Sequence, residues 1–296
     1  MLVGPTIRRR RLGSDLRRLR EQRSLRLEEV AAELGVAPST LSRIETGKAP
    51  TRTSYLALML DLYGVHDAAQ RRTLMDLARE GQRRGWWVGS EDLLPPGTGT
   101  YLGLEAEASE LRAFQSEVVH ALLWTRDYAR AVISARQPGL PADQTERLVR
   151  VGMRRQEVLL GSDPMRLRLI LDESVLSRAV AAPGVMRTQL EHLIDASRAP
   201  HVTIQVLRLR CPQRRLPAGS FGILRFAEPD DADVASSTGI RGQVLLEQRA
   251  SEVREVRQMF DALSESALGP QDSAELIGAA ISRLDAANRA PPARPR

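Results

Sequence analysis

The first eighty residues place apolar side chains at helical spacing, with short polar turns between the runs. This periodicity predicts helices, because residues three and four apart share one face of a helix. The positions that mark the first three helices are Leu12, Leu16 and Leu19; Leu27, Val30, Ala31 and Leu34; and Val36, Leu41 and Ile44. A fourth helix follows Thr53 and stops at Gly64, and a fifth covers residues 67–83. We therefore expect an all-α five-helix domain at residues 13–83, behind a basic arm at residues 1–12.

The pattern breaks off after this domain, where glycine and proline replace the periodic apolar residues. Clustered glycine and proline favour a loop, so we predict a linker over residues 84–103. Trp86 and Trp87 lie inside it, and we expect them to pin the linker onto a neighbouring domain, because aromatic rings bury a large area. The residues that form the cluster are Gly85, Gly89, Pro95, Pro96, Gly97 and Gly99.

Beyond the linker, helical and strand-like patterns alternate. Alternation of polar and apolar residues predicts strands at 165–171 and 202–207, and a β-like run predicts one at 221–226, with short strands near Val234 and at 244–246. We expect an α+β domain at residues 104–268, with a small sheet covered by helices, followed by a C-terminal helix and a frayed tail at 269–296. Helical periodicity marks residues 104–114, 118–135, 141–160, 185–197 and 250–268.

Composition is that of a folded two-domain protein. The chain has 296 residues, 42% of them hydrophobic, and no apolar run near the ~18 residues that a membrane span needs. Its start carries four arginines with no apolar segment of a secretory signal behind them. A single cysteine, Cys211, excludes a disulfide framework or a multi-cysteine zinc site within one chain. We expect a cytoplasmic protein.

The positive charge lies at the N-terminus. Lys and Arg total 43 against 37 Asp and Glu, a net charge of +6. The first 26 residues alone carry +7, since only Asp15 and Glu21 oppose their arginines. Such a cluster is typical of a nucleic-acid footprint, although an arginine run is also often a solvated arm. The arginines are Arg8, Arg9, Arg10, Arg11, Arg17, Arg18, Arg20, Arg23 and Arg26.

Residues 25–47 carry the most specific pattern in the chain. The pattern predicts a helix-turn-helix. Its first helix has the small Ala31 where the two helices touch, and Gly35 stands at a turn that needs positive φ. Val36 and Leu41 are the apolar residues that pack the second helix against the first. The second helix begins near Pro38. Such a helix enters the major groove of DNA.

The outward face of that second helix combines small residues with one arginine. Arg43 has the bidentate geometry that reads guanine, and Ser39 or Ser42 reaches a base or a phosphate. Thr40, at the helix start, and two cations just beyond the helix are placed to touch phosphates. The predicted DNA-binding residues are Pro38, Ser39, Thr40, Ser42, Arg43, Lys48, Arg52 and Arg26.

At these residues the chain resembles the Cro/repressor type, or xenobiotic-response-element (XRE) type, of bacterial helix-turn-helix regulators. The resemblance rests on the five-helix domain, the Gly35-Val36 turn and the ending Ser42-Arg43-Ile44-Glu45-Thr46-Gly47. It implies a structural ion pair between Arg20 and Glu45. The family commonly opens the first of the two helices with Thr or Ser and then Gln. Arg26 and Leu27 stand there instead, so the resemblance assigns the phosphate contact to Arg26.

The resemblance extends over roughly residues 13–268, to an actinobacterial subgroup described as antitoxin-like, whose C-terminal domain has no known function. It implies that this domain captures a small partner protein. The turn at 210–216 and the segment at 234–242 depart from the subgroup pattern, which alters any sensing or partner surface there. The segments that carry this similarity are 84–87, 94–97, 100–108, 125–131, 155–157, 171–173 and 202–207.

No pattern for catalysis or metal binding emerges. The four histidines lack ligand spacing, and no Ser-His-Asp or Cys-His arrangement occurs in a known local motif. We therefore expect no enzyme activity, no cofactor and no metal. The histidines are His66, His120, His192 and His201.

Our leading hypothesis is a sequence-specific transcriptional regulator that binds double-stranded DNA at an inverted repeat as a homodimer and is associated with the nucleoid. The alternative is an antitoxin-like module whose C-terminal domain captures a small partner protein, with DNA binding serving autoregulation. A small-molecule ligand at the same domain remains open, by analogy with two-domain regulators in general.

Overall fold

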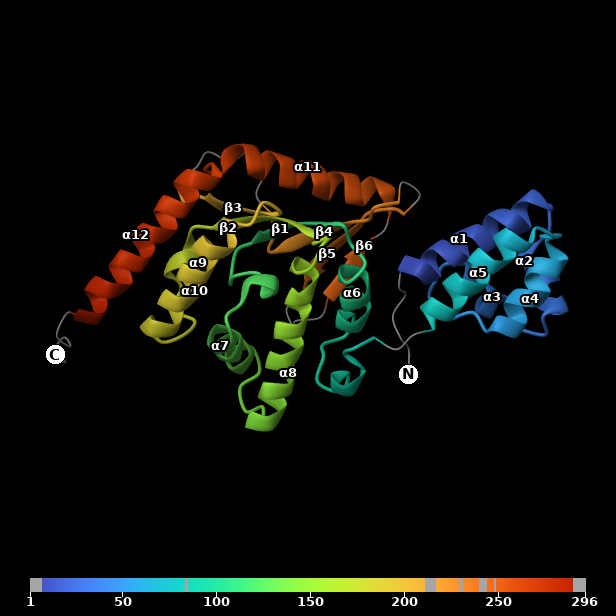
Figure 1. The fold of residues 1–296 in the computed structure, drawn as a ribbon, viewed down its shortest axis with the longest axis horizontal. Helices are drawn as coiled ribbons and strands as arrows, with labels where there is room; N and C mark the ends of the chain where they lie inside the picture. The colour runs from blue at the N-terminus through green and yellow to red at the C-terminus, as the bar shows by residue number, and fades with distance from the viewer. Residues whose placement is uncertain are drawn as a thin grey trace. The chain divides into compact units, whose positions relative to one another are not determined.

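The computed structural model describes residues 7–82, 85–210, 217–228, 231–239, 244–247 and 249–289. The chain forms two compact units (Figure 1). The first comprises Met1–Glu91, Gly97–Glu107 and Glu228–Asp231, and the second holds the rest of the chain. This division agrees with the expected fold class, a helical N-terminal domain followed by an α+β domain.

The described part of the first unit contains the five expected helices. They are α1 (Ile7–Gln22), α2 (Leu27–Glu33), α3 (Pro38–Glu45), α4 (Thr53–Leu62) and α5 (Ala68–Gly81). Helices α2 to α5 begin and end within a few residues of the positions that mark them in the sequence, whereas α1 begins at Ile7, before its first marker Leu12.

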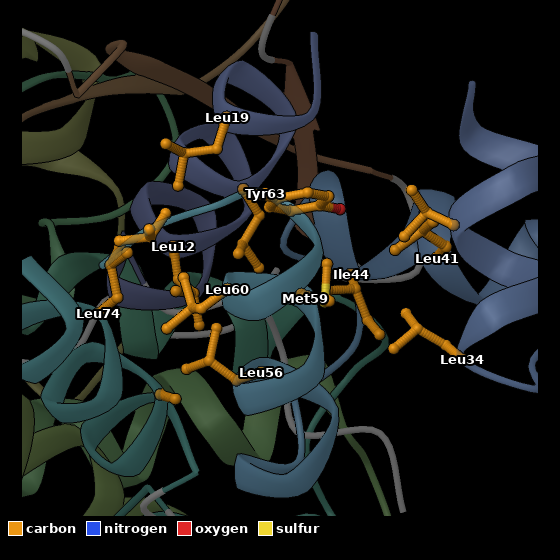
Figure 2. Packing of buried hydrophobic residues seen from close by; sticks show 14 of the residues in the cluster. Leu12, Leu19, Leu34, Leu41, Ile44, Leu56, Met59, Leu60, Tyr63 and Leu74 are labelled. Atoms are coloured by element: carbon orange, nitrogen blue, oxygen red, sulfur yellow. The ribbon is translucent and has the colours of Figure 1, made fainter. Parts of the chain in front are cut away.

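One apolar core joins these five helices. Side chains at helical spacing on each helix turn inward, as Figure 2 shows for Leu12, Leu41, Leu56, Leu60 and Tyr63. All five are at most 2% exposed. Burial of one apolar stripe per helix is the main source of stability in a unit of this size.

The expected basic arm at 1–12 is wrong for the residues that the structure describes. Helix α1 begins at Ile7, so Arg8–Arg11 are helical. Arg8 pairs with Glu80 at 2.9 Å, and buried Arg9 donates from Nε to the Gly81 carbonyl at the end of α5. The arginines are ordered because α1 packs along α5. Burial lowers the pKa of Arg9.

The expected linker at 84–103 also contains regular structure. A 3-10 turn, η1 (Val88–Ser90), is followed by helix α6 (Thr98–Glu105). Gly97, at φ +81°, precedes α6 as its N-cap. The side chain of Trp87 is 5% exposed and that of Trp86 stands edge-on to it, with 5.6 Å between the ring centroids. Residues 83 and 84 lie outside the described residues.

The described part of the second unit is a six-stranded mixed sheet with helices, in the order β3-β2-β1-β4-β5-β6. Strands β1, β2 and β3 run parallel, and β4, β5 and β6 continue antiparallel. The strands expected near 165–171, 202–207, 221–226, 234 and 244–246 are confirmed. Their bounds are β1 (Glu110–Gln115), β2 (Arg166–Asp172), β3 (Val202–Leu207), β4 (Phe221–Arg225), β5 (Val234–Thr238) and β6 (Val244–Glu247).

Helices cover this sheet, with α11 lying across one face and α7, α8 and α10 gathered on the other (Figure 1). The connections from β1 to β2 and from β2 to β3 supply the second group, as parallel strands require. The helical elements are η2 (Ala121–Leu123), α7 (Arg126–Arg136), α8 (Ala142–Arg155), η3 (Gln156–Leu159), α9 (Ser174–Ser177), α10 (Pro183–Ala196), α11 (Ala250–Ser266) and α12 (Pro270–Arg289).

The expected helix at 104–114 is wrong, because its second half is strand β1. Leu111 and Phe114 have the i, i+3 spacing of a helix, yet they pair with Leu167 and Ile170 of β2. A central strand is buried on both faces and therefore loses the strict alternation of polar and apolar residues. The frayed tail expected after α12 lies at 290–296, outside the described residues.

Candidate nucleic-acid interface

The helix-turn-helix is built around the turn after α2. Gly35 has φ +64°. Its N–H donates to the Ala32 carbonyl, and the Val36 N–H donates to the Ala31 carbonyl, both at 3.0 Å. These two bonds form a Schellman motif, which needs a left-handed residue and so favours glycine. The turn sets the direction in which α3 starts.

Helix α3 ends in the same way. Gly47, at φ +68°, donates to the Ile44 carbonyl at 2.9 Å, and the Lys48 N–H donates to the Arg43 carbonyl at 2.7 Å. A proline at its first position, Pro38, supplies the φ that a helix start needs. Helix α3 is therefore a short rod of eight residues with both ends defined by local sequence.

The two faces of α3 differ sharply. Leu41, Ile44 and Glu45 are buried against the rest of the unit. The residues that the sequence assigns to the DNA face lie on the opposite side, where Pro38, Ser39, Ser42 and Arg43 are exposed and Thr40 is half-buried. The structure thus brings the five α3 residues of the predicted interface to one outward face.

Arg43 differs from most arginines of this unit. Arg17 and Arg18 bond carboxylates of α1 at 2.8 and 2.6 Å, and Arg23 bonds the Tyr63 carbonyl at 2.8 Å. Within the part of the chain that the structure describes, the Arg43 guanidinium has no hydrogen-bond or ion-pair partner. Its donors are available to an external acceptor, whereas much of the N-terminal positive charge is already paired.

Three further predicted contacts lie outside α3. Arg26 is the N-cap of α2, and its backbone N–H donates to the Glu29 carboxylate at 2.8 Å while its side chain is exposed. Lys48 and Arg52 are exposed in the segment between α3 and α4. The Arg52 guanidinium lies over the Tyr55 ring, 5.9 Å from its centroid.

Beneath this face, the ion pair that the resemblance implies is present. Arg20 Nε donates to Glu45 Oε1 at 2.7 Å and Arg20 Nη2 to Glu45 Oε2 at 2.9 Å, while Nη1 donates to the Leu25 carbonyl at 2.8 Å. Arg20 is 8% and Glu45 6% exposed. The hydrogen bond with Glu45 raises the pKa of Arg20. Glu45 is the last residue of α3, so the pair ties α3 to α1.

Two contacts at this site escaped sequence reasoning. Gly13 of α1 lies against the last turn of α3, where an added Cβ would come within 2.5 Å of the Ile44 carbonyl oxygen. Arg23 caps the C-terminus of α4 through the Tyr63 and Gly64 carbonyls. A glycine inside a helical pattern is a signal for close packing, but the sequence does not say against what.

Two histidines of the second unit contact backbone groups. His120 is buried and accepts the Leu122 N–H at Nδ1, and His201 Nε2 lies 3.1 Å from the Leu159 carbonyl oxygen. Burial lowers the pKa of His192. The described residues contain no group of three or more His, Cys, Asp or Glu side chains that could hold a metal. Cys211 and most of the departing turn at 210–216 lie outside the described residues.

Among the described helices, none combines the length and apolar character needed to cross a membrane.

Comparison with known proteins agrees with the two-part architecture. A family model described as a helix-turn-helix domain matches residues 11–74, which cover α1 from residue 11 onward, α2 to α4 and half of α5. A second model, described as a domain of unknown function (DUF5753), matches residues 98–279. No curated protein and no solved structure matches the chain. The second match covers more than half of the chain, so the chain belongs to the DUF5753 family, and it joins that domain to an N-terminal helix-turn-helix domain.

Proposed function

We propose that this protein is a sequence-specific transcriptional regulator of the XRE type that binds an inverted repeat as a homodimer. Helix α3 of each copy enters the major groove, with the two half-sites about 34 Å apart along the duplex. The match to a helix-turn-helix domain supports DNA as the partner. The regulator acts in the cytoplasm, at the nucleoid.

One observation carries this proposal: α3 presents Arg43 outward, without a partner among the described residues, beside the small side chains of Ser39 and Ser42. Small neighbours let the helix backbone approach the base edges. A free guanidinium then forms two parallel hydrogen bonds to O6 and N7 of guanine. Lys48 and Arg52 provide phosphate contacts that fix the register of the helix on the duplex.

The proposal is tested by selecting random duplexes with the full chain at two salt concentrations and sequencing what is retained. We expect an inverted repeat that remains enriched at the higher salt. Binding that is blind to sequence and collapses with salt contradicts the proposal, because phosphate contacts alone behave in that way.

Replacing Arg43 by alanine should weaken binding to the selected sequence by about 1–3 kcal/mol and relax the preference at one base pair. The physical reason is the loss of two hydrogen bonds that only guanine accepts. The measurement is a titration of the variant against the selected duplex and against duplexes changed at single positions.

The matched control is Arg52→Ala, which removes a predicted phosphate contact from the same unit. It should weaken binding to all duplexes about equally and reduce the salt dependence by about one phosphate. An Arg43→Ala variant that behaves like this control contradicts the assigned reading role.

A second candidate function has support from the sheet of the second unit. Strand β6 ends the described sheet order, and the Val244 N–H on its outer side donates to the Pro96 carbonyl at 3.0 Å. The N–H groups of successive residues point to opposite edges of a strand, so the Leu246 N–H lies on the same outer edge as that of Val244. The Val244 donor is already bonded to Pro96, so the Leu246 N–H is the outer donor of β6 with which a strand from a partner would pair. This favours an antitoxin-like role, with capture of a small protein there and autoregulation through DNA.

Leu246→Pro tests this role, because proline removes that outer N–H and an edge strand tolerates it. The experiment co-expresses the chain with the small proteins that are encoded beside its gene. We expect the wild-type chain to retain one of these proteins on purification and the Leu246→Pro variant to lose it. Binding to the selected duplex should not change. Equal retention by both chains contradicts capture at β6.

A further inference from the structure

Five residues of the linker belong to a different unit from their neighbours in the chain. Asp92–Pro96 is part of the second unit, whereas the residues before it, up to Glu91, and after it, Gly97–Glu107, are part of the first. The segment lies between the two matched domains in sequence. Contacts with the second unit hold these five residues, which we call the strap.

Two polar contacts hold the strap at its ends. The Asp92 carboxylate accepts two hydrogen bonds from the Arg147 guanidinium of α8, from Nη2 at 2.8 Å and from Nη1 at 3.2 Å. At the other end, the Pro96 carbonyl accepts the Val244 N–H of β6 at 3.0 Å. The three residues between these ends are half-buried. The strap is therefore fastened to a helix at one end and to a strand at the other.

Both contacts are of a kind that a competitor can break. The Asp92 side chain is 62% and that of Arg147 30% exposed, and an exposed ion pair adds little stability because water screens it. The second contact is a single backbone hydrogen bond, whose net contribution is small because water can replace either partner. The strap can therefore leave β6 at a low cost in free energy.

The strap pairs with part of the edge that it covers. Strand β6 is four residues long, and Val244 and Leu246 direct their N–H and C=O groups outward. Pro95 and Pro96 have no N–H, so neither can donate to an outward carbonyl. Among the described residues, the Leu246 N–H has no hydrogen-bond partner. A strand that pairs with both outward residues must take the Val244 N–H from Pro96.

We propose that the strap is a removable cover of β6, which closes this edge of the sheet in the free protein and which a partner strand must displace. This inference rests on the second function proposed above, the capture of a small protein at β6, and adds its regulation. A covered edge also protects the free protein, because open strand edges pair with other chains. Since the strap lies in the linker, capture frees part of the connection between the two domains.

Hydrogen exchange of the full-length chain tests the cover without a partner. The Val244 amide should exchange more slowly than the Leu246 amide, each relative to its rate in an unfolded peptide. Replacing all five strap residues by glycine and serine should raise the Val244 rate by about tenfold. Arg147→Ala loosens one end of the strap and should raise it by about two- to fivefold.

The matched control is Arg154→Ala, which breaks another exposed ion pair of α8, with Glu157 at 3.9 Å. It leaves both ends of the strap intact, so the Val244 rate should not change. Val244 exchange that is the same in the wild type, the strap-replaced chain and Arg147→Ala overturns the cover.

Binding of the captured protein tests the displacement. The probe is the small protein, encoded beside the gene, that the wild-type chain retains. The strap-replaced chain should bind it about tenfold more tightly than the wild type, because the edge is already open. Adding Leu246→Pro should remove this gain. Equal affinity of the wild-type and strap-replaced chains overturns the proposal, and so does a gain that survives Leu246→Pro.

A different result addresses the capture function itself. If the wild-type chain retains no small protein, capture fails, and the cover is judged by self-association instead. The strap-replaced chain should then associate with further copies more than the wild type does, because opened edges pair with each other. Sedimentation measures this association, and Leu246→Pro should reverse it. Association that strap replacement leaves unchanged overturns the cover.

Discussion

Replacing Glu45 by alanine is expected to lower the free energy of unfolding of the helix-turn-helix unit by about 3–5 kcal/mol. The change leaves the Arg20 guanidinium buried without its counter-ion, and arginine cannot shed its proton to escape the cost. Among the described residues, Arg20 then keeps the bond to the Leu25 carbonyl and its more distant contact with Glu21. Thermal and urea unfolding followed by circular dichroism measure the loss.

Three variants separate the buried charge from other effects of the substitution. Arg17→Ala breaks an exposed pair on the same helix and should change stability little. Glu45→Gln keeps one hydrogen bond and should fall between wild type and Glu45→Ala. Arg20→Met combined with Glu45→Leu removes both charges and should recover part of the stability. A Glu45→Ala cost no larger than that of Arg17→Ala contradicts this account.

The local sequence determines much of the first unit. Gly35 and Gly47 stop α2 and α3 because each supplies the left-handed residue of a Schellman motif, and Pro38 starts α3. These signals act within a few residues, so they are readable without the fold. The outward face of α3 follows from the same periodicity, which explains why Ser42 and Arg43 lie where the pattern predicts.

The errors concern contacts between segments that are distant in sequence. Arg8 and Arg9 resemble a free arm until α5 is present to receive them, with partners at Glu80 and Gly81. Strand β1 shows the same dependence, because it is buried on both faces of the sheet and so loses the alternation that would identify it. No window of neighbouring residues contains this information.

The candidate site shows the same division between local patterns, which the sequence reveals, and long-range contacts, which it does not. The exposed face of α3 is readable from spacing, whereas Arg20 and Glu45 are 25 residues apart and were paired only through a family resemblance. Gly13 was not identified, because its role depends on a carbonyl of another helix. Such long-range contacts hold α3 in place, and the exposed face performs the recognition.

Gly13→Ala tests this support directly, because helix propensity and packing predict opposite changes in the free energy of unfolding. Glycine inside a helix costs about 0.5–1 kcal/mol relative to alanine, so helix propensity alone predicts a more stable α1. The structure predicts the reverse. A Cβ at residue 13 would lie 2.5 Å from the Ile44 carbonyl oxygen and 2.6 Å from that of Glu45, and both are backbone atoms. Relief requires α1 and α3 to move apart, and we expect a loss of about 1–3 kcal/mol in unfolding free energy.

The matched control is Gly278→Ala in the interior of α12, where an added Cβ meets nothing within 4 Å. There the propensity effect acts alone, and the second unit should gain about 0.5–1 kcal/mol. Gly13→Ala should also weaken binding to the selected duplex more than binding to random duplexes, because the two carbonyls belong to the last turn of α3 and the displacement moves Arg43. If both substitutions stabilise the protein, α1 does not hold α3 through Gly13, and the position of the reading helix rests on the Arg20–Glu45 pair and the apolar core.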